Sequence, residues 1–257
     1  MGKVVICFVH IPKTAGTSFR HGLMREFGPE NFLLDYGADD PETSEDVRCL
    51  YKQNVFNSNR IVEFIEKDQA DVICGHFPVS RYLAAFPGAT IISFVREPLQ
   101  RCYSEFLHFQ RLQNYTKPFE TFIQLKRAIN IQSIFLKGLP VNSIIGISEY
   151  YNQSVQLFNT KLNLSIPVFD LNCNRENLKK PYAEKVIGKE AVSLFYELNQ
   201  EDVQLYQKIL SQFLEEKNIW KGLFSGESAS AFFSKFKGNI NKLASSLSSF
   251  SPFNSLK

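Results

Sequence analysis

A loop rich in hydrogen-bond donors follows the first apolar run of the sequence. It covers residues 10–18, reads HIPKTAGTS, and lies between a strand-like run and a helical pattern. Backbone N–H groups at such a turn, with the positive end of the helix, form an anion site. Gly16 allows a ligand to approach the backbone closely, and Lys13 supplies a positive charge. The loop therefore predicts a phosphate site. Its other residues are Thr14, Ala15, Thr17 and Ser18, which supply further backbone N–H groups and hydroxyls.

A second candidate anion site lies in residues 94–106, FVREPLQRCYSEF. Arg96 ends a predicted strand, where ligands bind in open α/β sheets. Ser104 lies about two turns into the helix that follows, so the guanidinium and the hydroxyl could hold a second phosphate together. The alternative is a structural Arg96 that pairs with Glu97.

The order of residues in the first loop differs from that of a Walker A loop. In a Walker A loop the lysine follows the last glycine, whereas Lys13 precedes Gly16. The four histidines show no HExxH spacing, and the five cysteines form no CxxC pair. We therefore expect a site without a metal, and free thiols rather than a disulfide framework.

Short apolar runs alternate with helical patterns along the chain. The runs at 4–10, 71–74, 90–95 and 143–147 are typical of buried strands, and the segments 17–27, 59–67, 98–112 and 149–162 of helices. Pro98 suits a first helical turn, and Ser148 suits an N-cap. This alternation predicts an α/β fold of three layers, α/β/α, around a central parallel sheet.

The two anion segments together resemble the nucleotide-dependent sulfotransferases, in particular the carbohydrate branch (heparan-sulfate 2-O/6-O-like). PKTAGTS resembles the family's loop for the 5′-phosphosulfate of 3′-phosphoadenosine-5′-phosphosulfate (PAPS), and REPLQRCYS its segment for the 3′-phosphate. Weaker matches are CGHFP at 74–78, NIQSIFL at 130–136 and IGISE at 145–149; Ser133 stands where threonine is usual. The resemblance spans about residues 4–215 and implies a P-loop-type fold.

This resemblance implies sulfuryl transfer from PAPS to a hydroxyl of a carbohydrate acceptor, either a glycan or a glycolipid. The reaction is in line and loose, so catalysis is mainly positioning and electrostatics, with Lys13 stabilising the leaving phosphate. His76 is the expected general base, because it ends a predicted strand at the same edge and the family has its base in this turn. His10 is the second candidate. No Mg²⁺ is expected, since the sulfuryl group carries little charge.

Acceptor and adenine contacts are less defined. Arg81 and Tyr82, just after His76, are candidates for the acceptor, and Arg175 with Lys179 and Lys180 for the nucleotide. Glu149 is expected to anchor the start of its own helix. Two other functions stay open: a P-loop kinase, which needs a Gly-Lys-[Ser/Thr] order and a metal carboxylate, and a non-catalytic nucleotide- or glycan-binding module.

Composition limits the function classes. The chain has 257 residues, 44% of them hydrophobic, and a net charge of +3, which gives no reason to expect a nucleic-acid partner. No apolar run approaches the roughly 20 residues that span a bilayer, and the N-terminus lacks a signal-peptide pattern. We therefore expect a cytoplasmic enzyme.

Two segments depart from this pattern. Residues 30–46 carry seven carboxylates and no lysine or arginine, which is typical of a solvated loop or of a flap near the acceptor site. Residues 222–257 form a Ser/Phe/Lys-rich tail after a catalytic domain at 1–221. Apolar residues three or four apart from Phe232 to Phe250 predict an amphipathic helix, which could pack on the domain or contact a membrane surface. The oligomeric state stays open.

Overall fold

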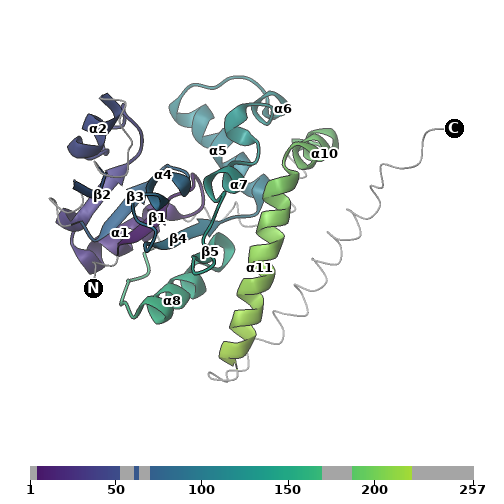
Figure 1. The fold of residues 1–257 in the computed structure, drawn as a ribbon. Helices are drawn as coiled ribbons and strands as arrows, with labels where there is room; N and C mark the ends of the chain where they lie inside the picture. The colour runs from purple at the N-terminus through teal and green to yellow at the C-terminus, as the bar shows by residue number, and fades with distance from the viewer. Residues whose placement is uncertain (1–4, 53–60, 64–69, 170–186, 222–257) are drawn as a thin grey trace. The chain divides into compact units, whose positions relative to one another are not determined.

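A computed structural model describes residues 5–52, 61–63, 70–169 and 187–221 (Figure 1). The chain divides into two compact units, Met1–Phe213 and Leu214–Lys257. Of the second unit, only the final turns of helix α11 are described, and the tail at 222–257 lies outside the described residues. The expected division at residue 221 therefore stays a prediction.

A parallel five-stranded sheet forms the centre of the first unit. Its strands are β1 (Ile6–Val9), β2 (Phe32–Asp35), β3 (Val72–Gly75), β4 (Thr90–Val95) and β5 (Ile144–Ile147), in the order β2-β3-β1-β4-β5. Val9 is level with Gly75 of β3 and with Ser93 of β4. The segments that follow β1, β3 and β4 therefore leave the same edge of the sheet side by side, which confirms the predicted α/β fold.

Aromatic packing attaches two helices to one face of the sheet. These are α1 (Gly16–Phe27) and α8 (Tyr151–Leu162). Phe19 of α1 contacts Phe94 of β4 and Phe158 of α8, with ring centroids 5.0 Å apart in each pair. All three rings are fully buried. This contact fixes the start of α1, and with it the loop that precedes the helix.

The opposite side of the sheet carries short helices. They include α4 (Ser80–Leu83) and α7 (Ile131–Phe135), which lie above the sheet in Figure 1 while α8 lies below it. The remaining short elements are η1 (Pro29–Asn31), α2 (Glu45–Lys52), η2 (Lys126–Ala128) and η3 (Ser148–Tyr150).

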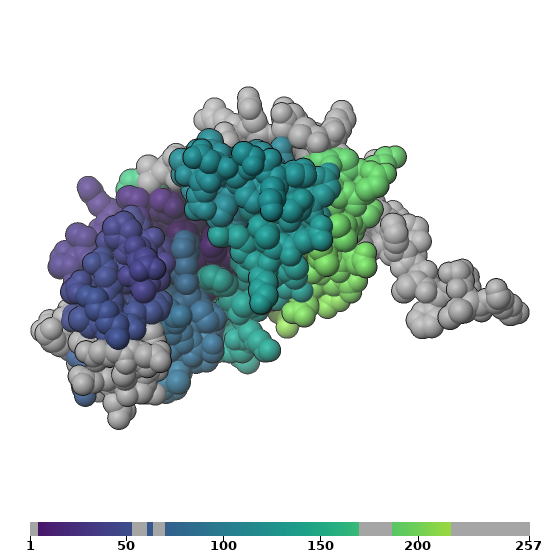
Figure 2. All heavy atoms as spheres, turned by 90° about the horizontal axis from the view of Figure 1, so that it is seen from above, coloured from purple at the N-terminus to yellow at the C-terminus, as the bar shows by residue number. Residues whose placement is uncertain are grey.

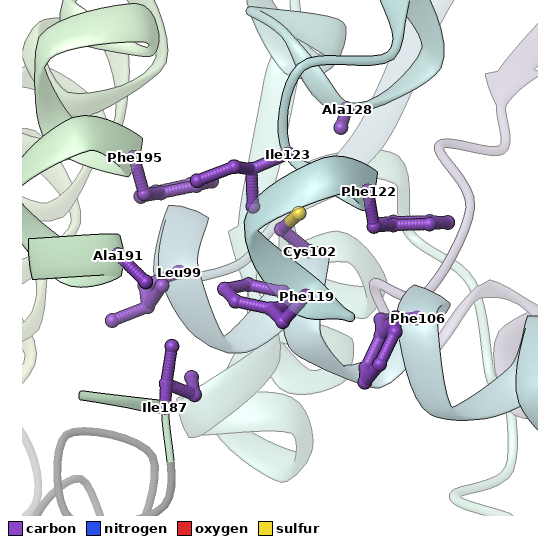
Figure 3. Packing of buried hydrophobic residues seen from close by; sticks show 10 residues of the cluster. All are labelled: Leu99, Cys102, Phe106, Phe119, Phe122, Ile123, Ala128, Ile187, Ala191 and Phe195. Atoms are coloured by element: carbon purple, nitrogen blue, oxygen red, sulfur yellow. The ribbon is translucent and has the colours of Figure 1, made fainter. Parts of the chain in front are cut away.

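A second apolar core lies beneath α5 (Pro98–Leu112), where α6 (Phe119–Phe122) and α10 (Lys189–Leu198) pack against it (Figure 3). Leu99, Cys102 and Phe106 project from α5 into this cluster. Glu97 caps α5 by accepting a hydrogen bond from Gln100 N–H at 2.9 Å, and Pro98 occupies its first turn as predicted. Helix α5 is thus held firmly, so its opposite face can carry functional groups.

The structure corrects several local predictions. The acidic segment 30–46 is not a solvated loop, because it contains β2 and the start of α2. Ser148 is not an N-cap; it lies inside η3, and no side chain caps that turn. The predicted helix at 59–67 is helical at 61–63, and its other residues lie outside the described part. Helix α11 (Gln200–Lys221) had no counterpart among the predicted elements.

Candidate active site

The loop after β1 has an unusual backbone. Lys13 and Ala15 have φ angles of 68° and 67°, a left-handed conformation that is rare for residues other than glycine. The Thr14 hydroxyl donates a 2.8 Å hydrogen bond to the Ile11 carbonyl oxygen, which closes the turn. Strained backbone of this kind clusters at ligand sites, and left-handed residues at a helix start turn successive N–H groups toward one anion.

Gly16 begins α1, and its lack of a side chain leaves room for the ring of His10. A Cβ atom at Gly16 would lie 2.0 Å from Cδ2 of the His10 ring. The sequence suggested that this glycine admits a ligand, but in the structure the adjacent imidazole fills that space. The His10 ring is 7% exposed and stacks on Phe8, with centroids 5.6 Å apart.

Arg96 meets the loop directly. Its Nη1 donates a 3.2 Å hydrogen bond to the carbonyl oxygen of Lys13, although 83 residues separate the two in sequence. The contact follows from the sheet order, because β1 and β4 are neighbours and both residues follow the ends of these strands. This contact brings the two predicted anion segments side by side, which an Arg96 that pairs with Glu97 would not by itself explain.

Helix α5 turns one face toward this loop. Ser104, His108 and Arg111 are spaced four and three residues apart, so they share a face of the helix. Burial lowers the pKa of Lys13, Glu105 opposes this change, and Arg111 and Arg96 add to it. Lys13 and Arg111 likewise lower the pKa of His108, after burial. Several positive groups thus gather where the sequence predicted the phosphates.

His76 directly follows β3, next to the end of β1. Its Nδ1 lies 2.6 Å from the carbonyl oxygen of His10, and the two imidazole centroids are 4.5 Å apart. Burial lowers the pKa of His76 below its ordinary value of 6.5. The second histidine, His10, has a pKa lowered much further, chiefly by burial and then by the charge of His76. His76 is the more accessible of the two, because its ring is only partly buried.

Tyr36 completes this cluster, although no sequence pattern predicts its position there. Its hydroxyl lies 3.0 Å from Nδ1 of His10 and 3.4 Å from Sγ of Cys74. Its ring meets the His76 ring edge to face, with centroids 4.7 Å apart. Tyr36 follows β2, which was assigned to a loop, so its position beside the histidines could not be inferred.

The two candidates for acceptor contacts, Arg81 and Tyr82, bind the carboxylate of Asp35, whose backbone carbonyl oxygen accepts a 2.8 Å hydrogen bond from His76 N–H. Tyr82 is 1% exposed and donates to Asp35 Oδ2 at 2.9 Å, so this candidate is wrong. Arg81 donates to the same oxygen at 2.8 Å and also contacts Tyr51. Asp35 is fully buried, and its carboxylate is the common partner of these three side chains. This network holds α2 and α4 against the end of β2.

Glu149 binds its own backbone N–H in the turn before α8, and it also anchors a second helix. Its Oε1 accepts a 2.8 Å hydrogen bond from the backbone N–H of Glu97, the N-cap residue of α5. Burial raises the pKa of Glu149, while this hydrogen bond opposes the rise. Glu149 therefore connects the end of β5 to the start of the helix that carries Ser104.

The described residues hold no group of three or more His, Cys, Asp or Glu side chains arranged to bind a metal ion. Within the same residues, no helix combines the length and apolar character needed to span a bilayer. Cys7, Cys74 and Cys102 are buried free thiols, and Cys49 is a free, partly exposed one. Arg175, Lys179 and Lys180, the expected nucleotide contacts, lie outside the described residues.

Comparisons with known proteins agree with this geometry. The model of the sulfotransferase family matches residues 2–140, more than half of the chain, which includes both anion segments and His76. A sulfotransferase from Alicyclobacillus acidocaldarius superposes with a TM-score of 0.51 at 16% identity, covering 83% of this chain and 99% of that one. Mouse sulfotransferase SULT7A1, complexed with PAP, superposes with a TM-score of 0.50 at 13% identity. The match covers 84% of this chain and 89% of the mouse chain.

At these identities the two structures establish the shared fold, and no curated protein sequence matches the chain. The family match favours an enzyme over a non-catalytic binding module, and a sulfotransferase over a kinase. The parallel sheet, the loop after its first strand and the family match lead to one assignment: this chain belongs to the sulfotransferase family.

Proposed function

We propose that this sulfotransferase transfers the sulfuryl group of PAPS to a hydroxyl of a carbohydrate acceptor, a glycan or a glycolipid. The observation that carries the proposal is the 3.2 Å hydrogen bond from Arg96 Nη1 to the Lys13 carbonyl oxygen. It joins the two anion segments at one edge of the sheet. A nucleotide with phosphates at both its 5′ and 3′ positions can reach both segments at once.

Each segment has a distinct part in binding the donor. The backbone of residues 13–18 and the helix start bind the 5′-phosphosulfate, with the hydroxyls of Thr17 and Ser18 as further donors. Arg96 and Ser104 bind the 3′-phosphate, the guanidinium through a charge-assisted fork. The PAP complex of a structural neighbour supports this choice of nucleotide.

In the transfer step, one residue accepts the proton of the acceptor hydroxyl and another stabilises the negative charge of the leaving phosphate. The acceptor oxygen attacks sulfur and forms a new S–O bond, while the bond from sulfur to the 5′-phosphate oxygen breaks. The acceptor proton passes to Nε2 of His76, whose Nδ1 faces the His10 carbonyl oxygen. Lys13 stabilises the negative charge that remains on the 5′-phosphate of PAP. The monoanionic sulfuryl group needs no divalent cation for neutralisation.

The carbohydrate acceptor rests on the CGHFP and NIQSIFL motifs, which resemble the carbohydrate branch. The charges near His76 refine this choice. Arg20 forms an ion pair with Glu42, and Arg81 pairs with Asp35, so each of these arginines already has a carboxylate partner. Neutral glycosides and glycolipids therefore take first place in an acceptor screen, with uronic-acid glycans as the comparison.

A thermal-shift panel tests the donor. PAP and PAPS should raise the melting temperature with or without Mg²⁺, because a ligand that binds the native state stabilises it by mass action. Stabilisation by ATP or ADP that requires Mg²⁺ would contradict the proposal and favour a kinase. Transfer of ³⁵S from labelled PAPS then identifies the acceptor, and the absence of transfer to any carbohydrate would refute that part of the proposal.

A further inference from the structure

The side chain of Gln132 binds the backbone of Arg96 from both sides. The Arg96 N–H donates to Gln132 Oε1 at 2.8 Å, and Gln132 Nε2 donates to the Arg96 carbonyl oxygen at 2.9 Å. Gln132 is fully buried. Its amide group therefore pairs with the Arg96 backbone as a neighbouring strand would, directly beyond the last residue pair between β4 and β5.

The position of this contact in the sheet explains its importance. The ladder between β4 and β5 ends at the pair Val95 and Ile147, so Arg96 is the first residue beyond it. A residue at a free strand end can adopt several backbone conformations, each of which directs its side chain differently. The amide of Gln132 holds Arg96 in the conformation whose guanidinium reaches the Lys13 carbonyl oxygen.

Gln132 is itself held from the start of α11. Asp202, 1% exposed, accepts hydrogen bonds from the backbone N–H groups of Gln132 at 3.2 Å and Ser133 at 2.7 Å. Asn199 Oδ1 accepts from Asn130 N–H at 2.8 Å, and Asn130 Oδ1 accepts from Asp202 N–H at 3.2 Å. These reciprocal bonds fix α7 on α11, and they leave the side chain of Gln132 free to bind Arg96.

We propose that Gln132 is a positioning residue that orients Arg96 for the 3′-phosphate of the donor, with α7 and the start of α11 as its support. This inference rests on the proposed function, because Arg96 must bind that phosphate. We do not expect Gln132 to bind the ligand, because the oxygen and the nitrogen of its amide both bind the Arg96 backbone. The sequence motif NIQSIFL thereby gains a physical role in donor specificity.

Substitution of Gln132→Met tests the proposal, because methionine has a similar length and lacks both hydrogen-bonding groups. Binding of PAP and of adenosine 5′-phosphate is measured by calorimetry with the full-length protein. The two ligands differ only in the 3′-phosphate, so the ratio of their affinities reports on its recognition. We expect the variant to lose about tenfold of the preference for PAP, the effect of one misplaced charged hydrogen bond.

Asn199→Ala is the matched control. Asn199 is as buried as Gln132 and supports the same end of α7, but its side chain binds the backbone of Asn130 and Phe195. It should lower the melting temperature and leave the affinity ratio unchanged. A ratio that falls equally in both variants would show that Gln132 acts only through general packing, and would overturn the proposal.

The double variant Arg96→Ala/Gln132→Met completes a thermodynamic cycle. If Gln132 acts through Arg96, Gln132→Met has no further effect on the ratio once Arg96 is absent; additive losses would overturn the proposal. The wild type separates this inference from the proposed function. A wild type that binds both nucleotides equally refutes the 3′-phosphate site itself. If the wild type prefers PAP and the affinity ratio of Gln132→Met equals that of the wild type, only the role of Gln132 is refuted.

Discussion

Nδ1 of His76 donates a hydrogen bond to the backbone carbonyl oxygen of His10, 2.6 Å away. A carbonyl oxygen can only accept, so the proton of the neutral imidazole lies on Nδ1 and the lone pair lies on Nε2. The contact exists because β1 and β3 are adjacent and parallel, with Val9 level with Gly75. One tertiary contact thus fixes the tautomer that a general base requires.

Replacement of His76 by alanine should reduce kcat by about 100- to 10,000-fold, the usual contribution of a general base. PAP affinity should stay close to that of the wild type, because the site that we propose binds the donor through residues 13–18 and Arg96. Single-turnover transfer of labelled sulfate and calorimetry with PAP check the two parts. Near-normal turnover in His76→Ala would move the base elsewhere, with His10 the next residue to test.

The pH dependence of kcat/KM should reflect the buried setting of His76. Burial lowers its pKa below 6.5, so the neutral form that accepts a proton persists to lower pH than it would in free histidine. Activity should therefore stay level from neutral pH to below pH 6.5 before it declines. Initial rates measured in one mixed buffer from pH 5 to 8 provide the test, and a decline centred above pH 6.5 would contradict it.

Folding stability should fall when the pH drops below about 6.5. His10, His76 and His108 have lowered pKa values in the folded protein, so the unfolded chain takes up protons first and is favoured. Each such group contributes up to about 1.4 kcal/mol per pH unit within its window. The raised pKa values of Glu149 and Asp202 act in the opposite direction at lower pH.

Urea unfolding at pH 7.5, 6.5 and 5.5 measures this effect. His76→Gln should reduce the slope of stability against pH between 6.5 and 5.5, because one of the histidines with a lowered pKa no longer titrates. An identical slope in the wild type and His76→Gln would show that burial does not suppress protonation of this residue.

Adjacent substitutions in the phosphate loop should have opposite effects. Ala15→Gly relieves a left-handed conformation but adds freedom to the unfolded chain, so stability should rise by about 1 kcal/mol or less. Gly16→Ala should lower stability by about 1–3 kcal/mol, because its Cβ would lie 2.0 Å from the His10 ring. Thermal unfolding of both variants measures the contrast, and equal losses would contradict this account of the loop.

The Asp35 network should affect stability rather than acceptor binding. Asp35→Ala leaves Arg81 without its carboxylate and should cost about 3–5 kcal/mol. Tyr82→Phe removes one buried hydrogen bond and should cost about 1 kcal/mol. With an acceptor in hand, Tyr82→Phe should leave the acceptor KM unchanged. A large increase in that KM would return Tyr82 to the acceptor site.

Several of these relationships join residues that lie far apart in sequence. In Figure 2 the purple and blue residues of the first elements lie beside the teal residues of the middle of the chain. Arg96 meets Lys13 across 83 residues, and Tyr36 meets His10 across 26. Such contacts depend on strand order, which no local pattern encodes.

The sequence by itself determined the class of fold and located the two segments that it predicts to bind anions. Continuous apolar runs identified buried strands at β1, β3, β4 and β5, and the hydrogen-bond donors of residues 10–18 predict a phosphate loop, because these signals are local. Strand β2 was missed because its four residues, FLLD, lie within an acidic segment whose charge suggested solvent.

Only the tertiary structure decided which groups act together. The carboxylate of Asp35 is buried because Arg81, Tyr82 and Tyr51 surround it, and none of these partners can be identified from the segment itself. Likewise, the sheet order β2-β3-β1-β4-β5 brings Lys13, His76 and Arg96 to one edge, and the amide of Gln132 sets the backbone of Arg96. Side-chain patterns specify elements, whereas the pairing of strands specifies the site.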